Sequence, residues 1–151
     1  MTTPTSDRVA TLFGTIRKSL GKLASAGLLS FVLNVAPVPA SRPKVSRWGV
    51  YYSKTYSKFL RSTQEELSKH NGKPTQGPIV VMMEHVVERP RTGKLGLPRG
   101  DVDNFAKGPL DAMTKAGTFW WDDEQVALLV ASKRYAKDGE QPRTEVHWFP
   151  I

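Results

Sequence analysis

The run from Pro78 to Val87 constrains the fold of this chain most, because it is rich in Ile, Val and Met. An unbroken run of branched and apolar residues is typical of a β-strand that is buried in the protein interior. A chain of 151 residues can form one domain that buries such a strand without disulfide bonds. We therefore expect a single domain whose other elements pack around this strand.

Apolar side chains recur at helical spacing in three further segments. Residues 9–20 follow a group of capping side chains, and residues 54–70 end at a glycine-containing turn. Residues 102–116 place apolar side chains, from Val102 to Ala116, on one side and charged side chains on the other. Gly108-Pro109 interrupts this pattern, because a proline inside a helix lacks a donor and clashes with the preceding turn. The sequence predicts three helices, the third with a kink or a late start.

Residues 28–36, 125–135 and 144–149 are predicted to be further strands. Three prolines between residues 37 and 43 force an extended segment that cannot pair fully in a sheet. The expected order is helix, strand, helix, strand, helix, strand, strand. This order predicts an α+β fold, with a mixed sheet and helices packed on it.

The extended segment combines cations with aromatic residues, at Arg42, Lys44, Arg47, Trp48 and Tyr51. Such a mixture can hold phosphates and stack a base. The alternative is a solvated loop with Trp48 and Tyr51 turned inward. Without a neighbouring chemical motif we favour the alternative.

The sequence contains no cysteine, which excludes disulfides and thiolate chemistry and fits a reducing compartment. His70, His85 and His147 show no paired spacing for a zinc site. The apolar run Gly27–Ala36 follows several cations, as in a secretion signal, but it contains polar residues and is shorter than the roughly 20 residues of a membrane span. We predict a cytoplasmic protein with no membrane segment and no small-molecule cofactor.

The stretch from Asp101 to Asp123 contains the residues best suited to chemistry. Asp101 and Asp103 are two positions apart, Lys107 follows Asp103 at i, i+4 spacing, and Asp122 and Asp123 come after three aromatic residues. Clustered carboxylates repel one another and favour a hard cation such as Mg²⁺. Three carboxylates and a lysine around a divalent ion can activate water and stabilise charge on a phosphodiester. On spacing alone, we favour the alternative that the same residues are a surface ion pair and helix-capping groups.

Charge is distributed unevenly along the chain. Residues 1–100 contain 16 Lys and Arg and 5 Asp and Glu, a net charge of +11, whereas residues 101–151 contain 6 and 9, a net charge of −3. A cationic surface attracts a polyanion such as nucleic acid, although excess charge also keeps proteins soluble. The basic loop at residues 88–100 leads directly into the carboxylates. The candidate DNA-binding residues are Arg42, Lys44, Arg47, Arg89, Arg91, Lys94 and Arg99.

An ordered set of motifs gives a more specific indication. The motifs are Asp-Val-Asp-Asn at 101–104, Lys107, Leu-Asp-Ala-Met at 110–113, Thr-Lys-Ala-Gly at 114–117 and Trp-Asp-Asp-Glu-Gln-Val at 121–126. Together they resemble the signature of the RusA family of Holliday junction resolvases, and residues 37–51 resemble the extended segment near the start of many such proteins. The similarity covers about residues 28–149. We therefore expect an N-terminal helical extension at 1–27 and a RusA-like endonuclease domain at 28–151.

The resemblance implies a homodimeric, Mg²⁺-dependent endonuclease that binds four-way DNA junctions and makes paired symmetric nicks during DNA recombination and repair. Mn²⁺ is expected to substitute for Mg²⁺. At the matching positions, it implies that Asp101, Asp103 and Asp123 bind the metal and that Lys107 is the essential lysine. A two-fold dimer suits this task because it presents two identical sites to a junction. A phage or prophage origin fits the family.

The chain departs from the family pattern in two places. The stretch between Gly117 and the acidic pair is one residue longer, so Asp122 is a possible ligand in place of Asp123. Gly108-Pro109 is unusual and affects how Lys107 is oriented. Two alternatives in function stay open. One is a non-catalytic protein that binds branched DNA, and the other is a metal nuclease that acts on forks or flaps.

Overall fold

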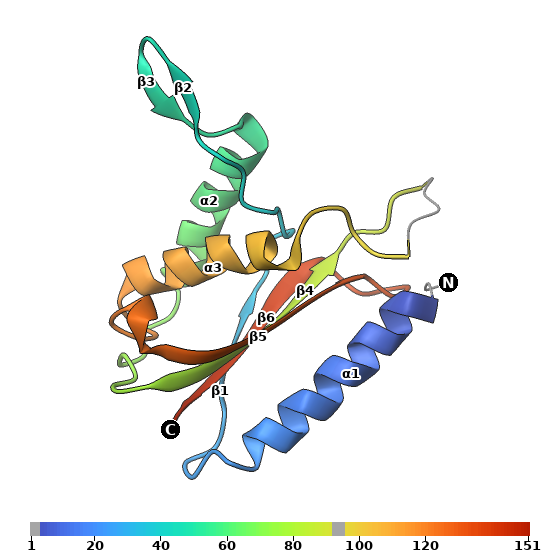
Figure 1. Ribbon diagram of the computed structural model, residues 1–151, viewed down its shortest axis with the longest axis vertical. Coiled ribbons are helices and arrows are strands. Elements are labelled where there is room, and N and C mark those ends of the chain that lie inside the picture. The colour runs from blue at the N-terminus through green and yellow to red at the C-terminus, as the bar shows by residue number, and fades with distance from the viewer. Residues whose placement is uncertain (1–3, 92–95) are drawn as a thin grey trace.

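The computed structural model describes residues 4–91 and 96–151 (Figure 1). In chain order its elements are α1 (Pro4–Gly21), β1 (Leu29–Leu33), β2 (Lys44–Ser46), β3 (Gly49–Tyr51), α2 (Lys54–Leu67), β4 (Ile79–Val87), α3 (Val102–Ala116), the 3-10 turn η1 (Asp123–Gln125), β5 (Val126–Tyr135) and β6 (Arg143–Pro150). The α+β class and the order of the predicted elements are confirmed. The short strands β2 and β3 add to that order, and β1 is shorter than the predicted strand at residues 28–36.

The main sheet is mixed, as expected. Its strand order is β1-β6-β4-β5. β4 pairs with β5 in parallel and with β6 antiparallel, and β6 pairs antiparallel with β1. Two parallel neighbours need a crossover connection, and α3 lies in the connection from β4 to β5. α3 therefore runs back along the sheet, and the residues before and after it lie near opposite ends of these strands.

Helices cover both faces of the sheet (Figure 1). Ile79, Val81 and Met83 pack in the larger core together with residues of α2 and α3. Val80 and Met82 point to the other face, where they pack with residues of α1. Residues 79–86 of β4 are all buried, which confirms the prediction of a strand inside the protein. Each such apolar side chain contributes about 1.5–3 kcal/mol on burial.

The predicted first helix is confirmed as α1, which packs on β5. Phe13 is buried in the core, and the Ser6 hydroxyl accepts a hydrogen bond from the Tyr135 backbone N–H at 2.9 Å. Leu12 and Ile16, from the predicted apolar stripe, are exposed because only part of the stripe faces the sheet. The division of the chain at residue 27 stays a prediction. Within residues 4–91 and 96–151, no helix combines the length and the apolar character that a membrane crossing requires.

α3 begins at Val102 and continues through Gly108-Pro109, so the predicted late start is wrong. A Cβ atom on Gly108 would lie 2.9 Å from Cε1 of Phe59, so glycine lets α2 approach α3 closely at this point. Val102 and Ala116 were expected on the apolar side but are exposed, because they lie in the terminal turns of the helix. The buried side of α3 lies between these ends, where α2 and the sheet cover it.

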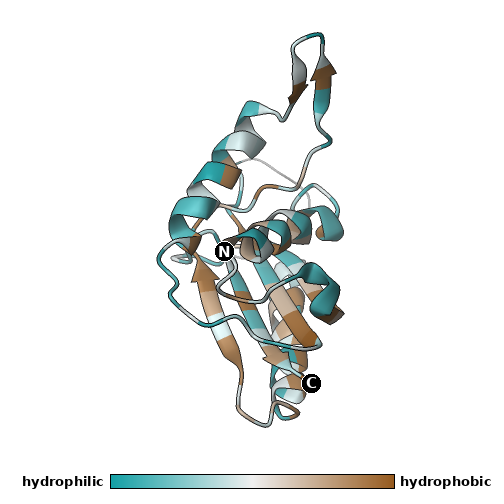
Figure 2. Cartoon of the chain, turned by 90° about the vertical axis from the view of Figure 1, so that its left-hand side faces the viewer, coloured by the Kyte–Doolittle hydropathy of each residue, from teal (hydrophilic) through white to brown (hydrophobic). Residues whose placement is uncertain are grey.

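β2 and β3 form a hairpin that projects from the body of the protein (Figures 1 and 2). Trp48 is 85% exposed and Tyr51 is also exposed, so the expectation that both turn inward is wrong. The physical reason is local pairing: Lys44 faces Tyr51 and Val45 faces Val50 within the hairpin itself. The two strands thereby pair their backbone groups with each other, and neither pairs with the main sheet.

Candidate metal and nucleic-acid site

Asp101 and Asp103 lie at the start of α3. Asp101 is the N-cap residue, and its side chain makes no capping hydrogen bond. Asp103 lies in the first turn, where the positive end of the helix dipole favours a negative charge. Both residues are exposed, so their carboxylates are accessible from solvent.

The backbone that carries these carboxylates is held on two sides. Lys133 of β5 donates a hydrogen bond to the carbonyl oxygen of Gly100, directly before Asp101. The backbone N–H of Ala40 donates to the carbonyl oxygen of Asn104 at 2.7 Å. The proline-rich segment and β5 therefore both fix the position of the start of α3.

Lys107 lies one helical turn after Asp103. Its ammonium nitrogen is 3.2 Å from a carboxylate oxygen of Asp111, one further turn along. The two side chains are 63% and 50% exposed, and an ion pair in such a position contributes at most about 1 kcal/mol. Lys107 can therefore exchange this carboxylate for a phosphate at small cost.

The two neighbouring aspartates after α3 differ in their contacts. Asp122 is the N-cap of η1, and its carboxylate accepts a hydrogen bond from the Glu124 backbone N–H at 2.9 Å. Asp123 is exposed, and its carboxyl group shares a hydrogen bond with Asp122. That hydrogen bond, slight burial and the negative charges of Asp122 and Asp111 raise the pKa of Asp123. Asp111 and Asp122 thus act electrostatically on Asp123.

The structure does not bring all the predicted ligands together within one chain. Asp101 and Asp103 lie at the start of α3, whereas Asp122 and Asp123 lie in the connection after its end (Figure 1). Even Asp111, which acts on Asp123, is ten residues beyond Asp101, or about 15 Å along a helix. Within the residues that the structure describes, no group of three or more Asp, Glu, His or Cys could hold a metal ion. The donor chemistry fits a hard divalent cation, but the arrangement in a single chain does not.

The predicted DNA-binding cations fall into two groups. The first group is exposed on the hairpin, with Arg42 at its base, Lys44 on β2 and Arg47 at its tip. Arg89, Arg91 and Arg99 are exposed in the connection that leads to Asp101. Lys94 lies outside the described residues.

A groove runs between α2 and α3 as three adjoining hollows with volumes of about 280, 400 and 430 Å³. The first hollow includes Arg42 and Lys107, and the second includes Arg61 and Lys115. Asp111 lines both of them. The groove therefore has cations along its length, from the base of the hairpin past Lys107 to Lys115 of α3.

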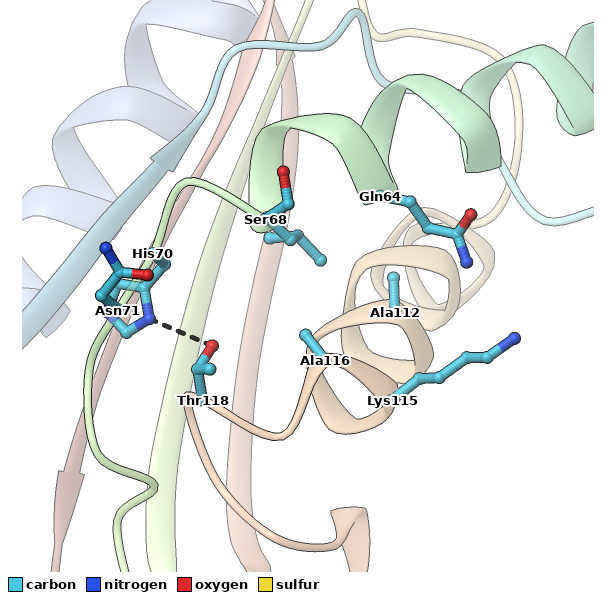
Figure 3. Close-up of a pocket in the computed structure, with 9 residues that line it drawn as sticks. Gln64, Ser68, His70, Asn71, Ala112, Lys115, Ala116 and Thr118 are labelled. Carbon is cyan, nitrogen blue, oxygen red and sulfur yellow. Dashed lines mark hydrogen bonds between the residues drawn. The ribbon is translucent and has the colours of Figure 1, made fainter.

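The third hollow lies at the end of the groove, beyond Lys115 (Figure 3). His70 forms a hydrogen bond through Nδ1 with the Thr118 hydroxyl at 3.2 Å. Its ring stacks on Phe119 with centroids 4.1 Å apart, and burial lowers the pKa of His70. A neutral histidine held in this way closes the end of the groove as a structural residue.

Arg61 and Lys115 were not among the residues predicted from the sequence. Each lies on the exposed side of a predicted helix, where a charged residue is usually only solvated. The helical periodicity identifies that side, but it does not show that α2 and α3 pack side by side and bring the two cations to one groove.

The comparisons with known proteins give a family. The family model described as endodeoxyribonuclease RusA matches residues 34–147. The matched range contains α2, α3, the acidic pair at 122 and 123, and the hairpin, whereas α1 and β1 precede it. No match was found among the curated proteins.

Proposed function

Because this chain belongs to the RusA family of endodeoxyribonucleases, we propose that it is a metal-dependent endonuclease that resolves four-way DNA junctions by paired symmetric nicks. The observation that carries the proposal is the family match over residues 34–147, which includes every proposed catalytic residue. The geometry supports it, because Asp101 and Asp103 are exposed at the start of α3 and Lys107 is exposed one turn further on.

The proposed metal ligands are Asp101, Asp103 and Asp123, and the proposed metal is Mg²⁺, with Mn²⁺ able to substitute. When bound, such an ion would lower the pKa of a bound water and polarise the phosphate. The capping bond of Asp122 to η1 occupies one of its oxygens, which supports Asp123 as the ligand. Asp122 remains the alternative.

A homodimer is part of the proposal. Among the described residues of one chain, Asp123 does not form a metal-holding group with Asp101 and Asp103, so in the proposed dimer the second copy brings its own acidic pair to the start of α3. A two-fold dimer would then contain two equivalent composite sites, as a junction with approximate two-fold symmetry requires. A monomer, in contrast, would have to rebind to cut the second strand.

Lys107 is proposed to stabilise the negative charge that develops on the scissile phosphate. Preorganised cations aimed at developing charge are among the largest contributions to catalysis. Its exposed pairing with Asp111 keeps the ammonium group on the solvent side of α3, where a DNA backbone can reach it. The cations of the α2–α3 groove would hold the same backbone on either side.

One observation favours a second candidate function. Because the carboxylates are not gathered within one chain, the protein can instead be a non-catalytic module that binds branched DNA. In that case the acidic residues would act only as helix caps and ion-pair partners. A fork or flap nuclease would share the site and differ only in its preferred substrate.

The decisive experiment compares the wild type with Asp103→Asn on a synthetic four-way junction. We expect the variant to lose Mg²⁺-dependent nicking while its binding to the junction stays the same or becomes tighter, because the metal is lost and one negative charge is removed. Glu65→Gln is the matched control, since it removes one negative charge from the exposed side of α2.

Each outcome separates the candidates. Nicking by Asp103→Asn at the wild-type rate would contradict the assigned role of Asp103. A wild type that binds junctions but cuts nothing with Mg²⁺ or Mn²⁺ would favour the binding module. Faster cutting of forks or flaps than of junctions would assign the alternative substrate.

A further inference from the structure

The β2–β3 hairpin has a composition that its own fold does not explain. Val45, Trp48 and Val50 are 82%, 85% and 68% exposed. A two-stranded hairpin without other support is only marginally stable in water, and apolar side chains that stay this exposed gain little from burial. Such an arm is expected to gain a contact when the protein binds its partner.

The tip of the hairpin holds Trp48 in a defined position. Arg47 and Trp48 form the turn between β2 and β3. The Ser46 hydroxyl accepts a hydrogen bond from the Trp48 backbone N–H at 3.1 Å and donates one to the Gly49 carbonyl oxygen at 3.3 Å. Gly49 has a φ of 123°, a conformation that favours glycine. The backbone under the indole is therefore fixed by local contacts.

Arg47 supports the indole ring from one side. Its guanidinium carbon lies 4.8 Å from the centroid of the Trp48 ring, which is the geometry of a cation–π contact. The high exposure of Trp48 leaves the rest of the ring open to solvent. An aromatic ring backed by a cation is well suited to stack on a nucleic-acid base, because bases have flat faces and lie next to phosphates.

Charge identifies the kind of partner. From residue 8 to residue 64 the sequence contains no Asp or Glu, while its cations are Arg8, Arg17, Lys18, Lys22, Arg42, Lys44, Arg47, Lys54, Lys58 and Arg61. Contact between the hairpins of two copies of this chain would bring like charges together. A polyanion is attracted instead.

The hairpin also stands close to the proposed catalytic face. Arg42 and Pro43, at its base, line a hollow of about 280 Å³ together with Asn104 and Lys107 of α3. A strand of three residues spans about 10 Å, so Trp48 extends roughly that far beyond the base. A DNA strand held beside Lys107 can therefore reach the tip of the hairpin.

We propose that the β2–β3 hairpin is a base-stacking arm, in which Trp48 stacks on an unstacked base at the branch point of DNA while Arg42 and Lys44 hold the adjoining phosphates. The inference rests on the proposed function, because it takes branched DNA as the substrate. It adds a residue and a role that the metal site does not require. A continuous duplex offers no free base face, so the arm contributes to selection of branched DNA.

The test measures equilibrium binding without divalent metal, so that it does not depend on cleavage. Trp48→Ala is expected to weaken binding to a four-way junction by about 5-fold to 150-fold, the range for loss of one stacked base, and to change binding to linear duplex less than twofold. Trp48→Phe should recover most of the affinity. Val45→Ala, an apolar truncation on the same arm, is the matched control and should bind the junction like the wild type.

A 2-aminopurine placed at the branch point gives a second readout. Its fluorescence in the complex should differ between wild type and Trp48→Ala and return towards the wild-type value with Trp48→Phe. Thermal unfolding of all variants should coincide, because Trp48 lies outside the core.

Unchanged junction affinity and an unchanged 2-aminopurine signal in Trp48→Ala would overturn the stacking arm and leave the proposed function intact. A Trp48→Ala variant that changes oligomeric state by light scattering, with junction binding preserved, would assign the hairpin to a protein contact and also overturn it. A wild type that binds junctions no more tightly than linear duplex would overturn both proposals together.

Discussion

His85 should make the stability of this protein depend on pH in the range where most proteins are insensitive. It is buried on β4, and its Nδ1 atom lies 3.0 Å from the Thr144 hydroxyl. Burial lowers the pKa of His85 from 6.5 to about 3. The fold therefore holds the neutral ring, whereas the unfolded chain takes up a proton as the pH falls below 6.5.

The sign and size follow from this difference. Because the folded pKa is the lower one, His85 destabilises the fold progressively as the pH falls from 6.5 towards 3. A pH of 5 lies about 1.5 units below the pKa of His85 in the unfolded chain. At roughly 1.36 kcal/mol per unit, the free energy of unfolding falls by about 2 kcal/mol. For a chain of this size, that loss should lower the melting temperature by about 4–8 °C.

The assay is urea unfolding at pH 8, 7, 6 and 5, followed by tryptophan fluorescence, for wild type and His85→Gln. The pKa values of His70 and His147 are also lowered by burial, so the difference between the two proteins isolates His85. The variant is expected to be less stable at pH 8 but to lose about 2 kcal/mol less than wild type between pH 8 and pH 5. Equal losses in the two proteins, or an NMR titration of the His85 ring above pH 6, would refute the reasoning.

Three further predictions concern packing, buried charge and DNA binding. Gly14→Ala, on an open part of α1, should raise the free energy of unfolding by about 1 kcal/mol in urea. At Gly108 a Cβ would meet an aromatic carbon of α2 at 2.9 Å, so Gly108→Ala should have a free energy of unfolding about 1–3 kcal/mol below that of Gly14→Ala. Arg134→Met should cost about 3–5 kcal/mol in the same assay, because it leaves the buried Glu84 carboxylate without the guanidinium 3.2 Å away, and adding Glu84→Gln should recover part of the loss. Arg61→Gln should make the slope of log K against log salt for junction binding shallower by about 0.9. An unchanged slope would show that Arg61 does not contact DNA in the groove between α2 and α3.

The elements that the sequence predicts well are those whose pattern is local. β4 is an unbroken apolar run, and the helical spacing in residues 54–70 and 102–116 depends only on neighbouring residues. The projection of Trp48 is different, because an apolar residue suggests burial unless the pairing of Lys44–Ser46 with Gly49–Tyr51 is known. Whether an isolated aromatic side chain is buried depends on tertiary packing, which the local sequence pattern does not show.

The candidate site shows the same division. The motifs single out Asp101, Asp103 and Lys107, and the structure has Asp101 at the N-cap of α3 and the other two within its first two turns. Asp123 is separated from the start of α3 because β4 pairs in parallel with β5, so the intervening helix runs back along the sheet. Spacing in the sequence contains no information on this pairing. Likewise, Asp122 and Asp123 are equivalent by composition, and only the cap of η1 distinguishes them.

Junction resolution is the activity that we propose for this chain. The most direct measurement maps nicks on a four-way junction in which each strand is labelled in turn, with purified full-length protein and Mg²⁺. We expect nicks at symmetric positions in one opposed pair of strands, and none without divalent metal. Stable junction binding without any nick in Mg²⁺ or Mn²⁺, or nicks at the same rate in linear duplex, would contradict it.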